Sequence, residues 1–221
     1  MTTLRLILGD QLNPEHSWFS QVDDNIVHVF MEMRQETDYV LHHAQKILAI
    51  FAGMRAFAAT LEAAGHRVHY LRIGDADNRQ VLTANLDWLI QRYDATGLMF
   101  QEPDEWRLDA QLNAYAQRQK ARGMTVTQVD SEHFYTHRTA VSEQFQGKKA
   151  WLMERFYRDM RLQHCVLMST GDKPVGGQWN FDHDNRQRWQ GQPAALRDQR
   201  PCHDHRALWA EIEAAGIKSF G

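Results

Sequence analysis

Charged side chains of both signs follow an apolar stretch near the start of the chain. Glu32, Arg34 and Glu36 come directly after residues 26–31, which read IVHVFM. A carboxylate at such a position can accept hydrogen bonds from the N–H groups of a heterocyclic ligand. A solvated turn produces the same spacing, and from spacing alone the turn is the simpler interpretation.

Two histidine-containing segments suggest metal ligands. His42 and His43 are adjacent, but neighbouring residues of a helix point about 100° apart and do not easily share one ion. The segment Cys202-His203-Asp204-His205 is the most metal-like by composition, yet its spacing matches no zinc pattern. A structural or surface role is favoured for both. A metal-dependent hydrolase that uses the twelve histidines is a further hypothesis.

A basic stretch lies later in the chain, where Arg155, Arg158 and Arg161 recur at intervals of three. Such a face can contact phosphates, but it is more often solvated or paired with acids. The sequence contains no G-x-G-x-x-G, no Walker phosphate loop and no G-x-S-x-G elbow. An ordinary dehydrogenase, NTPase or hydrolase is therefore disfavoured.

The elements that position these residues follow an alternating pattern. Short apolar runs predict five strands, at residues 3–8, 26–31, 67–73, 97–101 and 124–129. Helical periodicity predicts helices at about 40–64, closed by Gly65, at 78–93, and at 104–121 with Asp104 as a possible cap. Strands that alternate with helices favour an α/β fold with a doubly wound parallel sheet and helices on both faces. Ligands of such sheets bind at the carboxyl ends of the strands, here at residues 9–12, 32–36 and 102–107.

The alternation ends near residue 130, so we divide the chain into a domain at 1–135 and a helix with an extended connecting segment at 136–221. The helix spans about 149–165, with Met153, Phe156, Tyr157 and Met160 predicted to face inward. Residues 169–206 have the composition of an irregular tail, and residues 205–220 predict a short amphipathic helix.

Composition narrows the classes of function. The chain has 221 residues, 43% of them hydrophobic and 24% charged, as in a globular protein. A net charge of −3 gives no general attraction to nucleic acid, and the N-terminus resembles neither a signal peptide nor a membrane span. Only two cysteines occur, Cys165 and Cys202, which suits a cytoplasmic protein without a membrane partner.

Several ordered motifs resemble one family. They are LILGDQL at 6–12, M-E-x-R-x-E-x-x-Y-V-x-H-H-x-Q-K-I at 31–47, F-Y-R-x-M-R at 156–161 and G-G-Q-W-N-F-D-x-x-N-R at 176–186. These motifs are similar to the deoxyribodipyrimidine photolyase-related proteins, the iron–sulfur group of bacterial cryptochromes and (6-4) photolyases. The resemblance covers essentially the whole chain.

The resemblance implies a Rossmann-like domain that holds an antenna chromophore, 6,7-dimethyl-8-ribityllumazine. It implies light harvesting for light-driven DNA repair, which is a lyase reaction, or for blue-light signalling. Members of the family continue into a helical domain with FAD, a 4Fe-4S cluster and the lesion pocket, for which this sequence has no counterpart. We therefore expect this chain to bind a small-molecule chromophore, and damaged DNA only as part of the full-length protein.

The antenna contacts of the family correspond to Gly9, Asp10, Gln11, Leu12, Glu32 and Glu36. We expect Gly9 to let its backbone approach a flat ring and Glu36 to lie at the rim of the same cleft. An alternative is that Glu36 merely caps the long helix. A different alternative for the whole chain is a stand-alone nucleotide-binding or interaction module without photochemistry.

Overall fold

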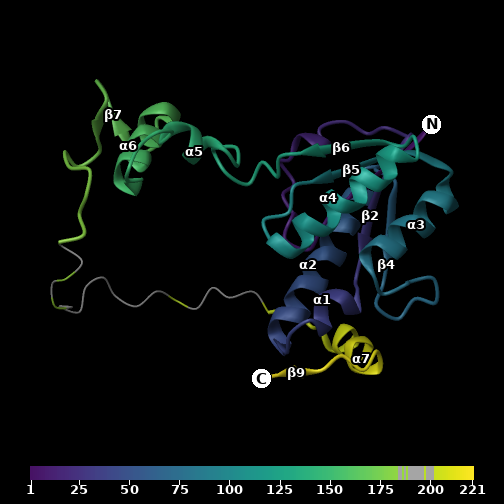
Figure 1. Cartoon of the computed structure of the whole chain (residues 1–221). Coiled ribbons are helices and arrows are strands. Elements are labelled where there is room, and N and C mark those ends of the chain that lie inside the picture. The colour runs from purple at the N-terminus through teal and green to yellow at the C-terminus, as the bar shows by residue number, and fades with distance from the viewer. Residues whose placement is uncertain (184–185, 187, 189–196, 198–201) are drawn as a thin grey trace. The chain divides into compact units, whose positions relative to one another are not determined.

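The computed structural model describes residues 1–183, 186, 188, 197 and 202–221. They belong to two compact units, one made of residues 1–133 with 203–221 and the other of residues 134–202 (Figure 1). The last nineteen residues, which the sequence grouped with the tail, therefore pack in the first unit. Trp189, a residue of the predicted irregular tail at 169–206, lies outside the described residues.

The first unit is built on a five-stranded sheet. Its strands are β1 (Thr2–Leu6), β2 (Ile26–Met31), β4 (Val68–Leu71), β5 (Ala95–Gln101) and β6 (Thr125–Val129). They are ordered β4-β2-β1-β5-β6, and every neighbouring pair is parallel. The predicted parallel, Rossmann-like sheet is confirmed. The chain starts at β1, winds outward through β2 and β4, and returns to β5, so the strand order reverses beside β1.

Helices cover both faces of this sheet (Figure 1). The helices α3 (Leu82–Tyr93) and α4 (Trp106–Ala121) bury side chains against one face, which includes Leu4 and Leu98. The helix α2 (Ala44–Ala63) covers the other face through a cluster that includes Phe30. Successive side chains of a strand point to opposite faces of the sheet, and here helices cover both faces. The side chains on both faces of each central strand must therefore be apolar. That requirement explains the continuous apolar runs in the sequence.

The long helix begins later than predicted. Short elements precede it, α1 (Arg34–Asp38) and β3 (His42–His43). Val40, expected in its buried stripe, is half exposed, so no burial stabilises a helix there. His43 caps α2, since its Nδ1 accepts a hydrogen bond from the Gln45 N–H. Glu36 lies in α1, so its proposed role as the cap of the long helix is wrong.

The cap predicted for α4 is also wrong. The carboxylate of Glu105, not that of Asp104, accepts hydrogen bonds from the backbone N–H groups of Arg107 and Leu108. The reason is geometric, because a cap must lie directly before the first helical residue, here Trp106.

The C-terminal segment is a helix followed by a strand, not one helix to residue 220. The helix α7 (Arg206–Ala214) ends before Gly216, which has a φ of +69°. The strand β9 (Ser219–Phe220) then pairs in parallel with β3. Leu208, Ile212 and Ile217 are buried in the cluster that α2 forms with the sheet. These contacts make the segment part of the first unit.

The second unit contains α5 (Ala140–Gln144), α6 (Met153–His164) and a small antiparallel hairpin of β7 (Met168–Ser169) and β8 (Lys173–Pro174). Met153 and Tyr157, predicted to face inward, are exposed, whereas Arg161 is buried. The Arg161 guanidinium donates to the carbonyl oxygens of Val166 and Leu167 and lies 5.2 Å from the ring of Trp179. Val166 and Leu167 follow the end of α6 at His164. Helical periodicity describes only residues within the helix, so it could not predict that Arg161 would be buried by these contacts.

One described helix, α2, has the length and composition of a membrane span. Six of its side chains are nevertheless buried in the protein, including Ile47, Phe51 and Leu61. A core helix meets the same criteria as a span, so this feature does not indicate a membrane.

One further short element, the 3-10 helix η1 (Ser17–Phe19), lies between β1 and β2.

Candidate ligand-binding pocket

A pocket of about 240 Å³ lies at the carboxyl ends of β1 and β2. By exposed area its lining is mostly apolar, and the apolar residues are Ile7, Leu8, Met31, Met33, Ile47, Ile50, Phe51, Met54 and Leu108. Gly9 and eight polar residues complete it: Asp10, Glu36, Thr37, Tyr39, His42, Lys46, Glu105 and Arg107. An apolar cavity with a few convergent polar groups is the usual form of a small-molecule site. The location beside the reversal of strand order is where doubly wound sheets bind ligands.

Gly9 lines this pocket, but its lack of a side chain serves the packing of α2. A Cβ atom at this position would lie 2.7 Å from Ile50 Cγ2 and 3.1 Å from Met54 Sδ. The first contact is shorter than real Cβ atoms make, the second is tight enough that Met54 would have to shift, and both partners also line the pocket. Glycine therefore lets α2 approach the loop after β1, and α2 then forms one wall of the pocket.

Asp10 adds a carboxyl group to the same pocket. Partial burial of this carboxyl raises the pKa of Asp10, and the negative charges of Asp104 and Glu36 act in the same direction. A hydrogen bond from its own backbone N–H and the nearby His133 oppose the rise. The group is thus more easily protonated than a free aspartic acid, although the residue itself remains exposed.

Glu36 is held at the pocket by an arginine from α4. Arg107 Nη2 lies 2.6 Å from Glu36 Oε2, and Arg107 Nη1 lies 3.1 Å from Glu36 Oε1. These hydrogen bonds raise the pKa of Arg107. The Arg107 guanidinium also lies 4.3 Å from the ring centroid of Tyr39. Glu36, Gly9 and Asp10 line one pocket, as expected, but the carboxylate of Glu36 already has a partner.

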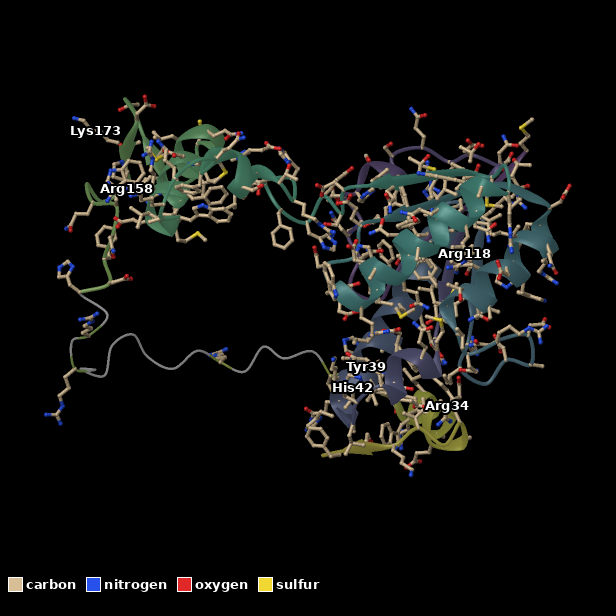
Figure 2. All side chains as sticks on the ribbon, in the orientation of Figure 1. Arg34, Tyr39, His42, Arg118, Arg158 and Lys173 are labelled. Carbon is tan, nitrogen blue, oxygen red and sulfur yellow. The ribbon has the colours of Figure 1, made fainter. Side chains whose placement is uncertain are left out.

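His42 and Lys46 complete the polar part of the pocket. Lys46 Nζ lies 3.3 Å from His42 Nδ1, and the His42 ring meets the ring of Tyr39 edge to face at 5.0 Å. Figure 2 labels Tyr39 and His42 in this region of the first unit. The spacing of residues suggested only a metal-ligand role for His42 and no individual role for Tyr39, Lys46 or Arg107. Tyr39, His42 and Lys46 belong to the Y-V-x-H-H-x-Q-K motif at residues 39–46, so this motif was the sequence signal that could have indicated them.

Gln11 and Leu12 take different positions. The buried Gln11 side chain accepts a hydrogen bond from the Leu8 N–H at 3.1 Å and donates one to the Gln101 carbonyl oxygen at 3.2 Å. It therefore connects the loop after β1 with the last residue of β5. Leu12 lies with Gly9 and Asp10 in a second, open pocket, whose other lining residues are Asn13, Pro14, Glu132 and His133.

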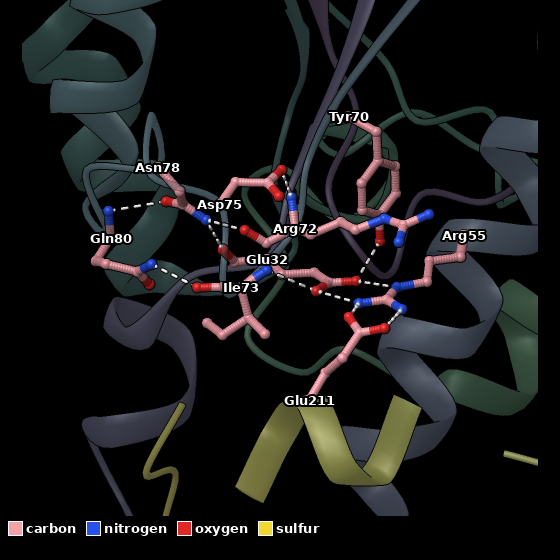
Figure 3. A network of polar contacts seen from close by, with 9 residues as sticks. All are labelled: Glu32, Arg55, Tyr70, Arg72, Ile73, Asp75, Asn78, Gln80 and Glu211. Atoms are coloured by element: carbon pink, nitrogen blue, oxygen red, sulfur yellow. Dashed lines mark hydrogen bonds and ion pairs between the residues drawn. The ribbon is translucent and has the colours of Figure 1, made fainter. Parts of the chain in front are cut away.

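Glu32 lies outside both pockets and is fully buried. Its carboxylate accepts hydrogen bonds from Arg55 Nε and Nη2 at 2.7 and 2.9 Å, from the Tyr70 hydroxyl at 2.7 Å and from the Ile73 N–H at 2.8 Å (Figure 3). Arg55 in turn binds Glu211 of α7. Burial alone would lower the pKa of Arg55, but its hydrogen bonds to both carboxylates raise it. The arrangement joins β2, α2 and α7.

Among the described residues, no three His, Cys, Asp or Glu side chains come together as a metal site would require. His42 and His43 point into different surroundings, since His42 lines the pocket and His43 caps α2. Cys165 and Cys202 are free, exposed thiols. The described part of the chain therefore offers no centre for the metal-dependent hydrolase hypothesis.

The sequence is similar to photolyase-related proteins over nearly its whole length. A family profile described as deoxyribodipyrimidine photo-lyase-related protein matches residues 5–221. A (6-4) photolyase from Agrobacterium fabrum is 39% identical over 204 residues, which are 91% of this chain and 39% of the relative. The crystal structure of a bacterial class III photolyase from Agrobacterium tumefaciens aligns with 58% of this chain and 25% of its own, with a TM-score of 0.42 and 16% identity. This chain thus spans well under half of the length of the photolyases that it resembles.

Proposed function

Because the chain belongs to the deoxyribodipyrimidine photolyase-related family, we propose that its first unit is the antenna-binding domain of a photolyase-like or cryptochrome-like flavoprotein. Its proposed ligand is 6,7-dimethyl-8-ribityllumazine. The observation that carries the proposal is the pocket itself, a largely apolar cavity with convergent polar groups at the reversal of strand order.

The dimensions of the two pockets suit a flat heterocycle that carries a polar chain. The first pocket, at about 240 Å³, lies just below the roughly 300 to 1,000 Å³ of drug-sized sites, which suits a bicyclic ring. Gly9 and Asp10 line both pockets. A ribityl chain that leaves the first pocket can therefore pass over these two residues into the second, where Asn13 and Glu132 offer polar contacts.

The residues of this chain have separate tasks in the proposed complex. The apolar lining excludes water from the ring, and Asp10 and Glu36 accept hydrogen bonds from ring or ribityl donors. The bound lumazine would supply light absorption. Gln11 and Glu32 support the site indirectly, Gln11 by joining the loop after β1 to the end of β5 and Glu32 by fixing Arg55 on α2.

The remaining activities belong to the proposed full-length protein. FAD, a 4Fe-4S cluster and the lesion pocket would lie in the region of the longer family members that this chain does not span. Light-driven DNA repair or blue-light signalling would need that region. Damaged DNA is accordingly a proposed partner of the full-length protein. The two free thiols agree with a proposed cytoplasmic location.

Fluorescence titration of the purified 221-residue chain tests the proposal. We expect saturable, one-to-one binding of 6,7-dimethyl-8-ribityllumazine, and much weaker binding of an adenine dinucleotide. In this fold the loop after β1 leads into the short 3-10 helix η1 and not into the N-terminus of an α-helix, so it offers a pyrophosphate no helix dipole. Tight dinucleotide binding without lumazine binding would instead establish the chain as a nucleotide-binding module.

A further inference from the structure

Two residues that line the first pocket each have a buried nitrogen without a hydrogen-bond partner in the described part of the chain, Arg107 Nε and His42 Nε2. The Arg107 guanidinium is already paired with Glu36, whereas His42 Nε2 is the candidate to contact a ligand. His42 is only 7% exposed and lines the pocket, and among the described residues its Nε2 atom makes no hydrogen bond. A buried nitrogen without a partner costs free energy, so native proteins retain few of them. Where such an atom belongs to a pocket, a bound ligand is the natural candidate for the missing partner.

Lys46 determines which hydrogen-bonding role that atom can play. Lys46 Nζ lies 3.3 Å from His42 Nδ1, and a lysine ammonium group has donors only. His42 Nδ1 must therefore accept, which places the proton of the neutral imidazole on Nε2. The unpartnered atom is consequently an N–H donor, and it requires an acceptor on the ligand.

The position of His42 is set by residues far away in the sequence. Its backbone belongs to β3, where His42 pairs with Ser219 of β9. The helix α7 before β9 is anchored by the ion pair between Arg55 and Glu211 (Figure 3). Buried Ile212 adds an apolar anchor. This bracing keeps the imidazole in one place, as recognition of a single ligand atom requires.

We propose that His42 is a specificity-determining residue that donates its Nε2 hydrogen to an acceptor atom of the bound chromophore, a ring carbonyl oxygen or an unprotonated ring nitrogen. The inference rests on the proposed function and extends it, since it selects for heterocycles that present an acceptor at this point. Lys46 acts as a positioning residue through the imidazole. A heterocycle with an N–H or a methyl group there would leave the donor unpaired and bind more weakly.

Affinity measurements on three variants test this role. Fluorescence titration with 6,7-dimethyl-8-ribityllumazine should show about tenfold weaker binding for His42→Phe, because one hydrogen bond is lost, while His42→Gln keeps a donor and should recover most of the affinity. The control His203→Phe changes an exposed histidine outside both pockets and should bind as the wild type does.

The competing explanation is that the His42 N–H rests on the ring of Tyr39, which the edge-to-face geometry permits. In that case His42→Phe would lower the melting temperature but leave the affinity unchanged, and this inference would be overturned while the proposed function stood. A wild-type chain that does not bind lumazine would overturn both.

Nitrogen-15 NMR of the histidine rings supplies a readout that does not depend on binding. We expect His42 to carry its proton on Nε2 in the free chain, the Nε2 resonance to shift when lumazine is added, and Lys46→Met to reduce the preference for this tautomer. A proton on Nδ1 in the free wild-type chain would contradict the assignment.

Discussion

Arg55 of α2 and Glu211 of α7 are 156 positions apart in the sequence, yet Arg55 Nη2 lies 2.6 Å from Glu211 Oε2. The other edge of the same guanidinium binds the fully buried Glu32. One arginine thus ties the C-terminal helix to the centre of the sheet, and its partners differ in burial. Glu32 has no exposed side-chain area, whereas Glu211 has 38%.

Removal of the Glu211 carboxylate should loosen α7. Glu211→Ala is expected to lower the free energy of unfolding by about 1 to 2 kcal/mol, because the pair is charge-assisted but partly exposed. Urea denaturation measures this change. Glu213→Ala, two residues later and exposed, is the matched control and should change stability by less than about 0.5 kcal/mol. Equal effects of both variants would show that the ion pair contributes nothing.

A side chain at Gly9 should push α2 away from the loop after β1. Gly9→Ala is expected to destabilise the protein by about 1 to 3 kcal/mol, because its Cβ would lie 2.7 Å from Ile50 Cγ2. Adding Ile50→Ala should relieve the clash, so the double variant should lose less stability than the sum of the two single changes. Gly74→Ala, which meets no atom within 4 Å, is the control. Strict additivity would refute the packing explanation.

Glu36→Ala should weaken lumazine binding by about tenfold or more, since the charge-assisted acceptor disappears from the pocket. Stability should change little, because Glu36 and Arg107 are both partly exposed. The control is Asp38→Ala in the same helix, whose carboxylate pairs with Arg34 and does not line the pocket. If Glu36→Ala keeps the wild-type affinity in fluorescence titration, Glu36 does not contact the ligand.

Stability should fall in mild acid because of His28. Burial, together with the positive charges of Arg5 and His66, lowers the pKa of His28 to about 3. Below pH 6.5 the unfolded chain binds a proton here that the folded protein does not bind. The contribution of this residue to the free energy of unfolding therefore falls between pH 6.5 and 3, by about 2 kcal/mol at pH 5.

Urea unfolding at pH 7 and pH 5 checks this expectation. His28→Phe should reduce the difference between the two pH values, whereas His203→Phe, which alters an exposed histidine, should preserve it. A His28→Phe variant with the wild-type pH dependence would mean that another group is responsible.

The predicted strands and the main helices are found in the structure because their signals are local. The strand predicted at residues 26–31 has the bounds of β2, and the stripe from Ile47 to Leu61 is buried along α2. Helix ends were predicted less well. A cap depends on one hydrogen bond, so composition near residue 104 does not distinguish Asp104 from Glu105, which makes that bond.

The candidate site shows the same division. The fold rule and the motifs indicate the loops after β1 and β2, and Gly9, Asp10 and Glu36 do line one pocket. Spacing does not reveal that Arg107 pairs with Glu36, because the two residues meet only when α4 packs beside α1.

The sequence by itself determined the parallel α/β fold and the family, since strand periodicity and ordered motifs depend on neighbouring residues alone. Only the tertiary structure decided the roles of the individual polar side chains. Glu32 and Glu36 are four residues apart, yet one is fully buried against Arg55 and the other lines the pocket. His42 lines the first pocket from β3, whose pairing partner β9 comes 177 residues later. Such roles depend on burial and on long-range partners, and neither is encoded within a short stretch of residues.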